Sequence, residues 1–378
     1  MAGDELPAQP SLLWRGGSAL TIGLTGFLCR TFLLGLNRLE VNGYEKFLEL
    51  LKSREDVQGR RRGLITGRLH RLDDPLIWGS LPYATHWRPD NNRWSLASHD
   101  LAFPNKALTT FFSLGNTLPA HRLTYSSFGG LFQPTMTQAI RLLSSGPFQP
   151  TRSHPFPTGS AESVPNLTDP FSEGALQYTT NGTDSIPAPS AYASRRHAWI
   201  HIFPEGKIHQ HPELTMRYFK WGVARLILEA EPCPDVVPMW IQGFDQIMHE
   251  SREFPRFLPR AGKSVSITFG DKVDTEQTFG DLRERWRELK ERVRKGNARP
   301  NARDDELGVI VEDELRTGAE AVKLREECTL RVRQEVLKLR ISRGLSEEDP
   351  KASLVETWRQ EGVKQEGKMK DGSWVKDT

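Results

Sequence analysis

"GLITGRLHRLDDPLIWG", residues 63–79, places an apolar run, a histidine and two aspartates in one short segment. The apolar and β-branched residues of "GLIT" predict a strand. His70 follows it, three residues before Asp73 and four before Asp74. A histidine close to an aspartate is typical of a base and the group that orients it. The segment therefore predicts a strand that leads into a candidate catalytic pair, His70 and Asp73.

Further strands and a helix are predicted after this segment. "HAWIHIFPEG" (197–206) is a short apolar strand that runs into Pro and Gly, and "FKWGVARLILEAE" has the spacing of a helix packed on a sheet. "DVVPMWIQGF" and "SVSITFGDKV" are rich in β-branched and aromatic residues, which favours buried strands. We therefore expect an α/β domain over residues 37–278, with a mixed sheet flanked by helices.

An apolar stretch near the N-terminus, residues 17–36, has about the length of a helix that crosses a bilayer. Arg30 interrupts it, and an arginine at the centre of a spanning helix costs roughly 3 kcal/mol. Asp4 and Glu5 precede the stretch and no small-residue cleavage site follows, which disfavours a cleaved signal peptide. Residues 1–36 therefore predict a spanning or interfacial anchor helix, with a buried core helix as the alternative.

Two other regions differ from the α/β domain in composition. Residues 144–196 are dense in Pro, Ser, Thr and Gly, which predicts a disordered insertion. Residues 279–378 mix charges of both signs in helical patterns, which predicts a solvated helical extension with a frayed end. Trp358 and Trp374 are the candidate docking points of that end.

The overall composition excludes several classes of function. A net charge of +3 over 378 residues does not by itself predict a nucleic-acid partner. The cysteines are far apart and form neither a metal-binding motif nor a disulfide framework, so each is expected to be a small buried residue: Cys29, Cys233 and Cys328. No Gly-rich nucleotide loop and no G-x-S-x-G nucleophile elbow occurs.

Three segments carry candidate binding residues. In "FFSLGNTLPAHR", Gly115 permits a bend and the Arg122 guanidinium could grip a phosphate, although a surface salt bridge is the simpler reading. In "FPEGK", Gly206 allows close backbone approach, with Glu205 and Lys207 expected to project from the turn. In "VVPMWIQG", Pro238 is expected to end a strand and line a pocket, or to be purely structural.

Taken together, these segments resemble the tafazzin family of the glycerophosphate acyltransferase superfamily. The resemblance covers about residues 10–275, and the insertion and charged tail look like its fungal branch. It rests on a series of blocks that recur in family order: "DDPLIWG", "FFSLG", "HIFPEG", "FKWGVARLI", "PMWIQGF" and "FPRFLPRAGKSVSITFGDKV".

The resemblance implies an acyltransferase fold and a membrane-bound transacylase. Such an enzyme moves acyl chains between phospholipids and lysophospholipids without coenzyme A, and remodels cardiolipin from monolysocardiolipin in mitochondrial membranes, on the side of the intermembrane space. It implies no cofactor, no metal and no nucleic acid, and it admits a membrane-associated oligomer. By family block, the catalytic pair falls on His70 and Asp73. The binding residues fall on Gly115, Arg122, Phe203, Pro204, Glu205, Gly206 and Pro238.

The first block departs from the family pattern H-x-x-x-x-D. Only two residues separate His70 from Asp73, and counting back from Asp73 places the family's histidine at Arg68. Three explanations stay open. His70 reaches the site from a shortened loop, where a helical turn would place it on one face with Asp74; or the protein is an inactive relative; or mis-joined coding segments have removed two residues.

Two rival assignments also stay open. His99 in "SLASHDLAF" is followed directly by Asp100, but adjacent residues of a strand face opposite sides, so a core or hydrogen-bonded histidine is expected there. The functional rivals are an acyl-CoA-dependent lysophospholipid acyltransferase and a catalytically impaired lipid-binding relative.

Overall fold

The central element of the fold is a seven-stranded mixed sheet in the order β1-β10-β9-β2-β7-β3-β4. The structure is a computed structural model that describes residues 8–57, 59–67, 73–146, 176–255, 258–296, 306–359 and 366–376. The strands of the sheet are β1 (Arg38–Asn42), β2 (Leu64–Gly67), β3 (Trp94–Ser98), β4 (Thr117–Ala120), β7 (Trp199–His201), β9 (Asp235–Gln242) and β10 (Ser264–Phe269). β9, β2, β7, β3 and β4 are parallel, whereas β10 runs antiparallel to β9. The predicted mixed α/β fold is confirmed.

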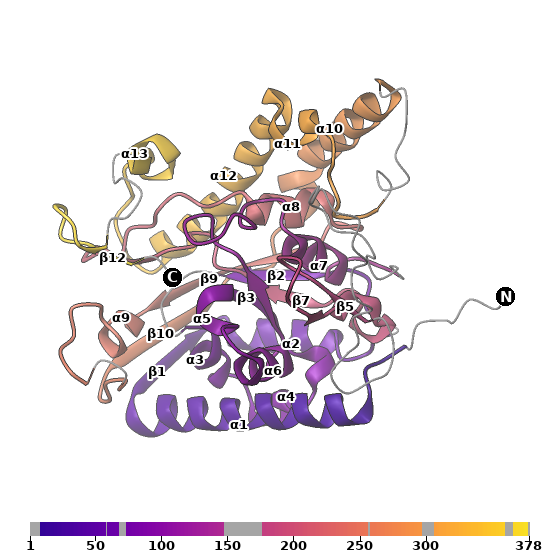
Figure 1. The fold of residues 1–378 in the computed structure, drawn as a ribbon. Coiled ribbons are helices and arrows are strands. Elements are labelled where there is room, and N and C mark those ends of the chain that lie inside the picture. The colour runs from indigo at the N-terminus through magenta and orange to yellow at the C-terminus, as the bar shows by residue number, and fades with distance from the viewer. Residues whose placement is uncertain are drawn as a thin grey trace.

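Helices cover both faces of this sheet (Figure 1). They are α1 (Leu12–Leu36), α2 (Tyr44–Ser53), α3 (Asp73–Gly79), α4 (Tyr83–His86), α5 (His99–Ala102), α6 (Lys106–Leu114), α7 (Pro134–Leu142), α8 (Gly222–Glu229), α9 (Phe244–Ile247), α10 (Thr275–Gly296), α11 (Asp313–Thr317), α12 (Ala319–Ser342) and α13 (Val355–Arg359). Short 3-10 helices lie at Pro89–Asn91, Pro189–Ala191, Ala193–Arg195 and Pro350–Ser353. Two apolar cores result, one between the sheet and α7, α8, α10 and α12, the other between the sheet and α1, α2 and α3.

The helices after Thr275 are part of the domain and not an extension of it. Trp286 of α10 and Leu324 of α12 are 1% and 0% exposed and belong to the same core as Ile200 of β7. Charged side chains of the two helices pair on their outer side, as in Arg331–Asp281. The charged helical pattern was predicted correctly, but the boundary at residue 279 is wrong, because each helix also has an apolar face that covers the sheet.

The end of the chain is also ordered within its described part. Strand β12 (Trp374–Lys376) pairs antiparallel with β8 (Ile208–Gln210), and β11 (Gly367–Lys368) pairs with β12. Trp358 donates its indole N–H to the carbonyl of Ala352 and lies 4.2 Å from the Arg217 guanidinium. The prediction of a frayed end is therefore wrong for these segments, whereas Trp358 and Trp374 do serve as docking points.

Part of the predicted disordered insertion has a defined structure. Its residues 147–175 lie outside the described residues. From Leu176 to Arg196 the chain forms the hairpin of β5 (Gln177–Tyr178) and β6 (Ile186–Pro187), followed by two 3-10 helices. Tyr178 and Ile186 are buried against α5 and α6 in a small apolar cluster with Phe103. The prediction of disorder fails here because a few apolar residues in a polar segment suffice to dock it.

Helix α1 lies along one side of the molecule, against α3, α4 and α6 (Figure 1). Glycines on its inner side allow this close approach, since a Cβ on Gly26 would lie 2.6 Å from the His86 ring and one on Gly23 2.9 Å from the Trp87 ring. The opposite side is apolar and exposed: Leu12, Leu13, Leu20, Leu24, Phe27, Leu28, Leu34 and Leu36. The predicted helix is confirmed, with an earlier start, and the alternative of a buried core helix is wrong.

Arg30 faces the protein body. Its guanidinium donates to the carbonyl oxygens of Ser80 at 3.1 Å and Leu81 at 2.7 Å, beyond the C-terminus of α3. A cation at a helix C-terminus is stabilised by carbonyl groups that have no partner within the helix. Arg30 therefore does not expose a charge on the apolar outer side of α1.

We expect the contact between α1 and α4 to make stability depend on pH. Burial first, and then the charges of Arg93 and Arg30, lowers the pKa of His86 to about 4. His86 is thus neutral in the folded protein, whereas the unfolded chain takes up a proton below about pH 6.5. The contribution of neutral His86 to the free energy of unfolding is therefore fully present above pH 6.5. It falls by on the order of 3 kcal/mol as the pH drops towards 4. Denaturation of His86→Gln between pH 7 and pH 4 should show a flatter pH dependence than the wild type, and equal slopes would contradict this.

Candidate active site

The predicted blocks meet at the C-terminal edge of the parallel strands. β2 ends at Gly67, which is in register with Pro238 of β9, and Thr66 is in register with His201 at the end of β7. Three blocks therefore lie side by side, because parallel strands end at one edge of the sheet. Arg122 follows β4, three strand spacings from β2, or roughly 14 Å along the sheet.

The Asp74 carboxylate is the polar centre of this edge. Arg93 donates through Nε to Oδ1 at 3.1 Å and through a terminal nitrogen to Oδ2 at 2.5 Å. His201 Nδ1 lies 3.0 Å from Oδ1, and the Trp78 indole N–H donates to the same oxygen at 3.0 Å. These contacts hold the start of α3, where Asp73 also lies, against β7.

The protonation states of this centre follow from its surroundings. Burial acts to raise the pKa of Asp74, but the positive charge of Arg93 and the hydrogen bond from His201 outweigh it, so the pKa lies well below its ordinary range. Burial lowers the pKa of His201 in spite of Asp74. The centre therefore combines an ionised carboxylate with a neutral imidazole that donates through Nδ1.

His201 resembles a catalytic histidine because it contacts an aspartate, Asp74, but it differs from one because its side chain is buried. Its Nε2 has no hydrogen-bond partner among the described residues, as a general base would require. However, its side chain is 0% exposed, between the rings of Trp78 and Phe203. Sequence reasoning missed this residue because a histidine within an apolar strand indicates a satisfied core position. Its contact with Asp74 becomes visible only in the structure, where β2 and β7 are neighbours with Thr66 in register with His201.

The predicted pair His70 and Asp73 is not tested by the geometry. His70 lies outside the described residues, within the segment 68–72 that joins β2 to α3. Asp73 is the first residue of α3. Asp73 therefore lies next to Asp74 at the start of α3, and the pairing of His70 with Asp73 stays a prediction.

Arg93 links the first block to the second. Besides Asp74, it donates to the carbonyl oxygen of Gly115 at 3.1 Å. Gly115 ends α6 and precedes β4, as the predicted bend requires. Arg93 was not singled out from the sequence, because nothing in its local pattern distinguishes it from a surface arginine.

The turn after β7 differs from its prediction in one respect. Gly206 has a φ of +58°, the left-handed conformation that favours glycine, and its carbonyl accepts from the Lys220 ammonium at 3.1 Å. Glu205 does not project, since it is 4% exposed and accepts from the backbone N–H of Arg217 at 3.0 Å. Pro204 accepts from the backbone N–H of Lys220 at 2.7 Å. Glu205 therefore helps to shape the turn from inside.

Pro238 lies within β9 and does not end it. The strand pairs with β2 up to Pro238 and with β10 from Met239 onwards. Proline lacks an N–H, so it is tolerated where the hydrogen-bonding partner of the strand changes. Pro238 and Pro204 line a small hollow of about 20 Å³ with Gly67, and Glu335 of α12 borders it. Pro238 thus borders a small hollow, and its part in substrate binding stays a prediction.

Arg122 forms a salt bridge in this structure. Its guanidinium contacts the carboxylate of Asp100 with two nitrogens and lies 4.2 Å from the centre of the Tyr125 ring. A phosphate that binds Arg122 must therefore compete with Asp100.

The rival histidine, His99, does not pair with its neighbour Asp100, because the Asp100 carboxylate is engaged by Arg122. His99 begins α5 and contacts Asp184, a hydrogen-bonded role as expected, but on a helix and not a strand.

Comparisons with known proteins show which family this chain belongs to. The acyltransferase family model matches residues 68–242. Tafazzin from Saccharomyces cerevisiae is 34% identical over 373 residues, which cover 94% of this chain and 87% of that protein. The chain belongs to the tafazzin family. Taffazin from Dictyostelium discoideum is 28% identical over 72% of this chain and 73% of its own length. N-acylphosphatidylethanolamine synthase from Arabidopsis thaliana is 24% identical over 63% of the chain and 64% of its own length.

This tafazzin-family chain is therefore an acyltransferase that acts on phospholipids. The matched range, 68–242, begins in the segment after β2 and ends with the last residue of β9. It contains Asp74, Arg93, the stretch from Gly115 to Arg122, the turn at Glu205–Gly206 and Pro238, and it excludes α1 and the helices after Thr275. The match to the yeast protein covers 94% of the chain and so reaches well beyond this shared domain.

Proposed function

We propose that this protein is a membrane-bound, coenzyme-A-independent transacylase that moves acyl chains between phospholipids and lysophospholipids. Cardiolipin and monolysocardiolipin are the proposed substrates, and mitochondrial membranes facing the intermembrane space the proposed location. One observation carries the proposal. The similarity to a yeast tafazzin extends over 94% of the chain and so includes regions outside the domain that acyltransferases share.

The residues at the C-terminal edge of the sheet have complementary proposed roles. His70 removes the proton of the lysophospholipid hydroxyl as it attacks an ester carbonyl of the donor phospholipid, and returns it to the glycerol oxygen that leaves when the donor's acyl–oxygen bond breaks. Asp73 orients His70 and stabilises the imidazolium. Asp74 holds α3, and therefore Asp73, in place through Arg93 and His201. The turn at Glu205–Gly206 shapes the acceptor site.

The same proposal assigns a location to α1. Its inner side is in contact with α3, α4 and α6, so a spanning orientation would carry polar parts of the domain into the hydrocarbon layer. We therefore propose that α1 lies in the membrane interface. Exposed aromatic residues of the adjoining α4, α4–β3 connection and α6 extend its apolar side: Tyr83, Trp87 and Phe111.

Charges on the outer side of α1 should abolish this attachment. Phe27 and Leu28 are 50% and 59% exposed, and a buried apolar side chain contributes about 2 kcal/mol to transfer from water. The double variant Phe27→Glu, Leu28→Glu should bind cardiolipin-containing vesicles at least about 100-fold more weakly in sedimentation assays. Leu354→Glu, at a 46% exposed leucine of the C-terminal region, is the matched control. Equal binding by both variants would contradict the interfacial role of α1.

The reaction itself is tested with purified protein in vesicles that contain labelled cardiolipin and a lysophospholipid, with and without acyl-CoA. We expect transfer of label without acyl-CoA. Transfer only with acyl-CoA would show the acyl-CoA-dependent reaction instead. Vesicle binding with no transfer under either condition would show a lipid-binding relative that is no longer active.

The assignment of the base is tested separately. His70→Ala should lower the rate by at least about 100-fold, since general-base catalysis typically contributes a factor of roughly 10² to 10⁴. His249→Ala is the control, since His249 follows α9 and contacts Ser251 and none of the residues of the Asp74 centre. Full activity of His70→Ala together with loss of activity in His201→Asn would move the base to His201. Sequencing the transcript across codons 64–74 tests whether residues of the motif are missing.

A further inference from the structure

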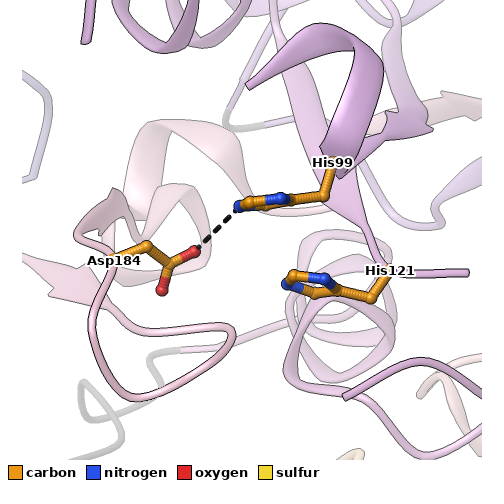
Figure 2. A group of neighbouring side chains, drawn as sticks. All are labelled: His99, His121 and Asp184. Carbon is orange, nitrogen blue, oxygen red and sulfur yellow. Dashed lines mark ion pairs between the residues drawn. The ribbon is translucent and has the colours of Figure 1, made fainter. Parts of the chain in front are cut away.

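Two histidines lie next to each other at the edge of the sheet, apart from the Asp74 centre. Ser98 of β3 is in register with Ala120 of β4, and each strand is followed directly by a histidine. His99 and His121 therefore leave the sheet side by side. Their rings stack with centroids 4.1 Å apart, and Figure 2 shows nitrogens of both rings on the side that faces Asp184.

Asp184 reaches this pair from the insertion. It lies in the turn between β5 and β6, and its Oδ2 is 3.4 Å from His99 Nε2. One ligand atom of each of the three residues lies within 4.8 Å of the others. Three separate segments of the chain thus bring two imidazoles and one carboxylate together.

We propose that His99, His121 and Asp184 bind one divalent transition-metal ion, with zinc as the best match, and that this ion fastens the insertion hairpin to the sheet. Two imidazole nitrogens and a carboxylate oxygen are a donor set that zinc accepts. The set leaves one coordination position for water or a hydroxyl group. This structural ion is separate from the acyl-transfer chemistry, for which the sequence implies no metal.

The donors are held by other groups, as ligands of bound metals are. Asp184 Oδ1 accepts from the Thr179 hydroxyl at 2.9 Å and from the Thr180 backbone N–H at 2.6 Å, which fixes the carboxylate. The backbone N–H of His121 donates to Gln133 Oε1 at 2.7 Å, and the Gln133 amide donates back to the His121 carbonyl. The Asp184 carboxylate and the His121 backbone are therefore held in place before any ion binds.

One adjustment is needed for coordination. Tetrahedral zinc places its donors about 3.3 Å apart, a spacing that His99 and Asp184 already have. His121 Nε2 is instead 2.7 Å from the Thr180 hydroxyl, which also contacts Asp184. A small turn of the His121 ring exchanges this hydroxyl for the ion, and Thr180 can then occupy the remaining coordination position.

The test uses the full-length protein, stripped with EDTA and titrated with zinc alone. We expect about one zinc per chain by mass spectrometry of the dialysed protein, a Tm raised by a few degrees, and slower amide exchange in residues 179–184. Co²⁺ in place of zinc should give the visible bands of four-coordinate cobalt. These readouts do not depend on acyl transfer, so their failure would leave the proposed function untouched.

Variants decide between an ion site and a simple polar contact. His121→Gln and Asp184→Asn should each weaken zinc binding at least about 100-fold, whereas His249→Ala should bind like the wild type. Asp184→Asn keeps an oxygen for the Thr180 N–H, so its far-UV circular dichroism should stay unchanged. Equal zinc binding by the wild type and Asp184→Asn would overturn the proposal. So would a wild type that binds no zinc, because the cluster would then be an ion pair and hydrogen bonds only.

Discussion

Replacing Asp74 by asparagine is expected to lower the free energy of unfolding by about 3 kcal/mol and to suppress acyl transfer. The substitution removes the charge that neutralises Arg93, whose side chain is 12% exposed, and weakens the acceptor of the His201 Nδ1–H. Breaking a buried ion pair from one side typically costs roughly 3–5 kcal/mol, because the remaining charge stays without compensation. Activity should fall as well, since α3 carries Asp73.

The stabilising effect of Asp74 should decrease as the pH falls. The pKa of Asp74 is lowered in the folded protein, so its contribution is fully present above the unfolded pKa of about 4 and is lost as the pH falls below that value. Urea denaturation should therefore show a constant difference between wild type and Asp74→Asn from pH 5 to pH 8, and a smaller one at lower pH.

A matched control separates this centre from an ordinary ion pair. Asp271→Asn removes a carboxylate that pairs with Lys46 on the surface, where the side chains are 75% and 73% exposed. Exposed pairs contribute about 0–1 kcal/mol, so this variant should unfold almost like the wild type. If Asp74→Asn proved as stable as Asp271→Asn, the Asp74 centre would not hold α3 in place.

Replacing Glu348 by glutamine is expected to cost a similar amount, about 3 kcal/mol. Its side chain is 1% exposed and accepts from Arg333 at 2.5 Å and from Arg340 at 3.2 Å, both on α12. It also accepts from the backbone N–H of Met216 at 2.6 Å. Glutamine would remove the negative charge that balances two buried guanidinium groups and leave them with neutral acceptors only.

Glu347→Gln is the control for this prediction, because Glu347 is the exposed neighbour. Chemical denaturation should show a large loss of stability in Glu348→Gln and almost none in Glu347→Gln. A chain that ends at Leu345 should lose at least as much stability as Glu348→Gln. A truncated chain as stable as the full one would mean that the end of the chain is an appendage, as its composition alone indicates.

The order and type of the main elements could be predicted from local sequence. The "GLIT" and "DVVPMWIQGF" segments form strands and residues 17–36 lie in a helix, because the period of apolar residues reflects the face that each element buries. The bend at Gly115 and the turn at Gly206 also follow from local sequence, whereas Pro238 lies within β9 and does not end it as predicted. For residues 144–196, composition alone predicted disorder, and the docking of Tyr178 and Ile186 could not be foreseen.

The sequence by itself thus determined the family, the strand and helix segments and the candidate residues, all of which follow from short-range patterns. Only the tertiary structure decided which side chains meet. Asp74 pairs with His201, 127 residues away, because β2 and β7 are parallel neighbours in a particular register. Burial of Glu348 and of Asp184 likewise depends on distant segments that exclude water. Charges, hydrogen bonds and pKa values are set by these long-range neighbours, which no local period in the sequence encodes.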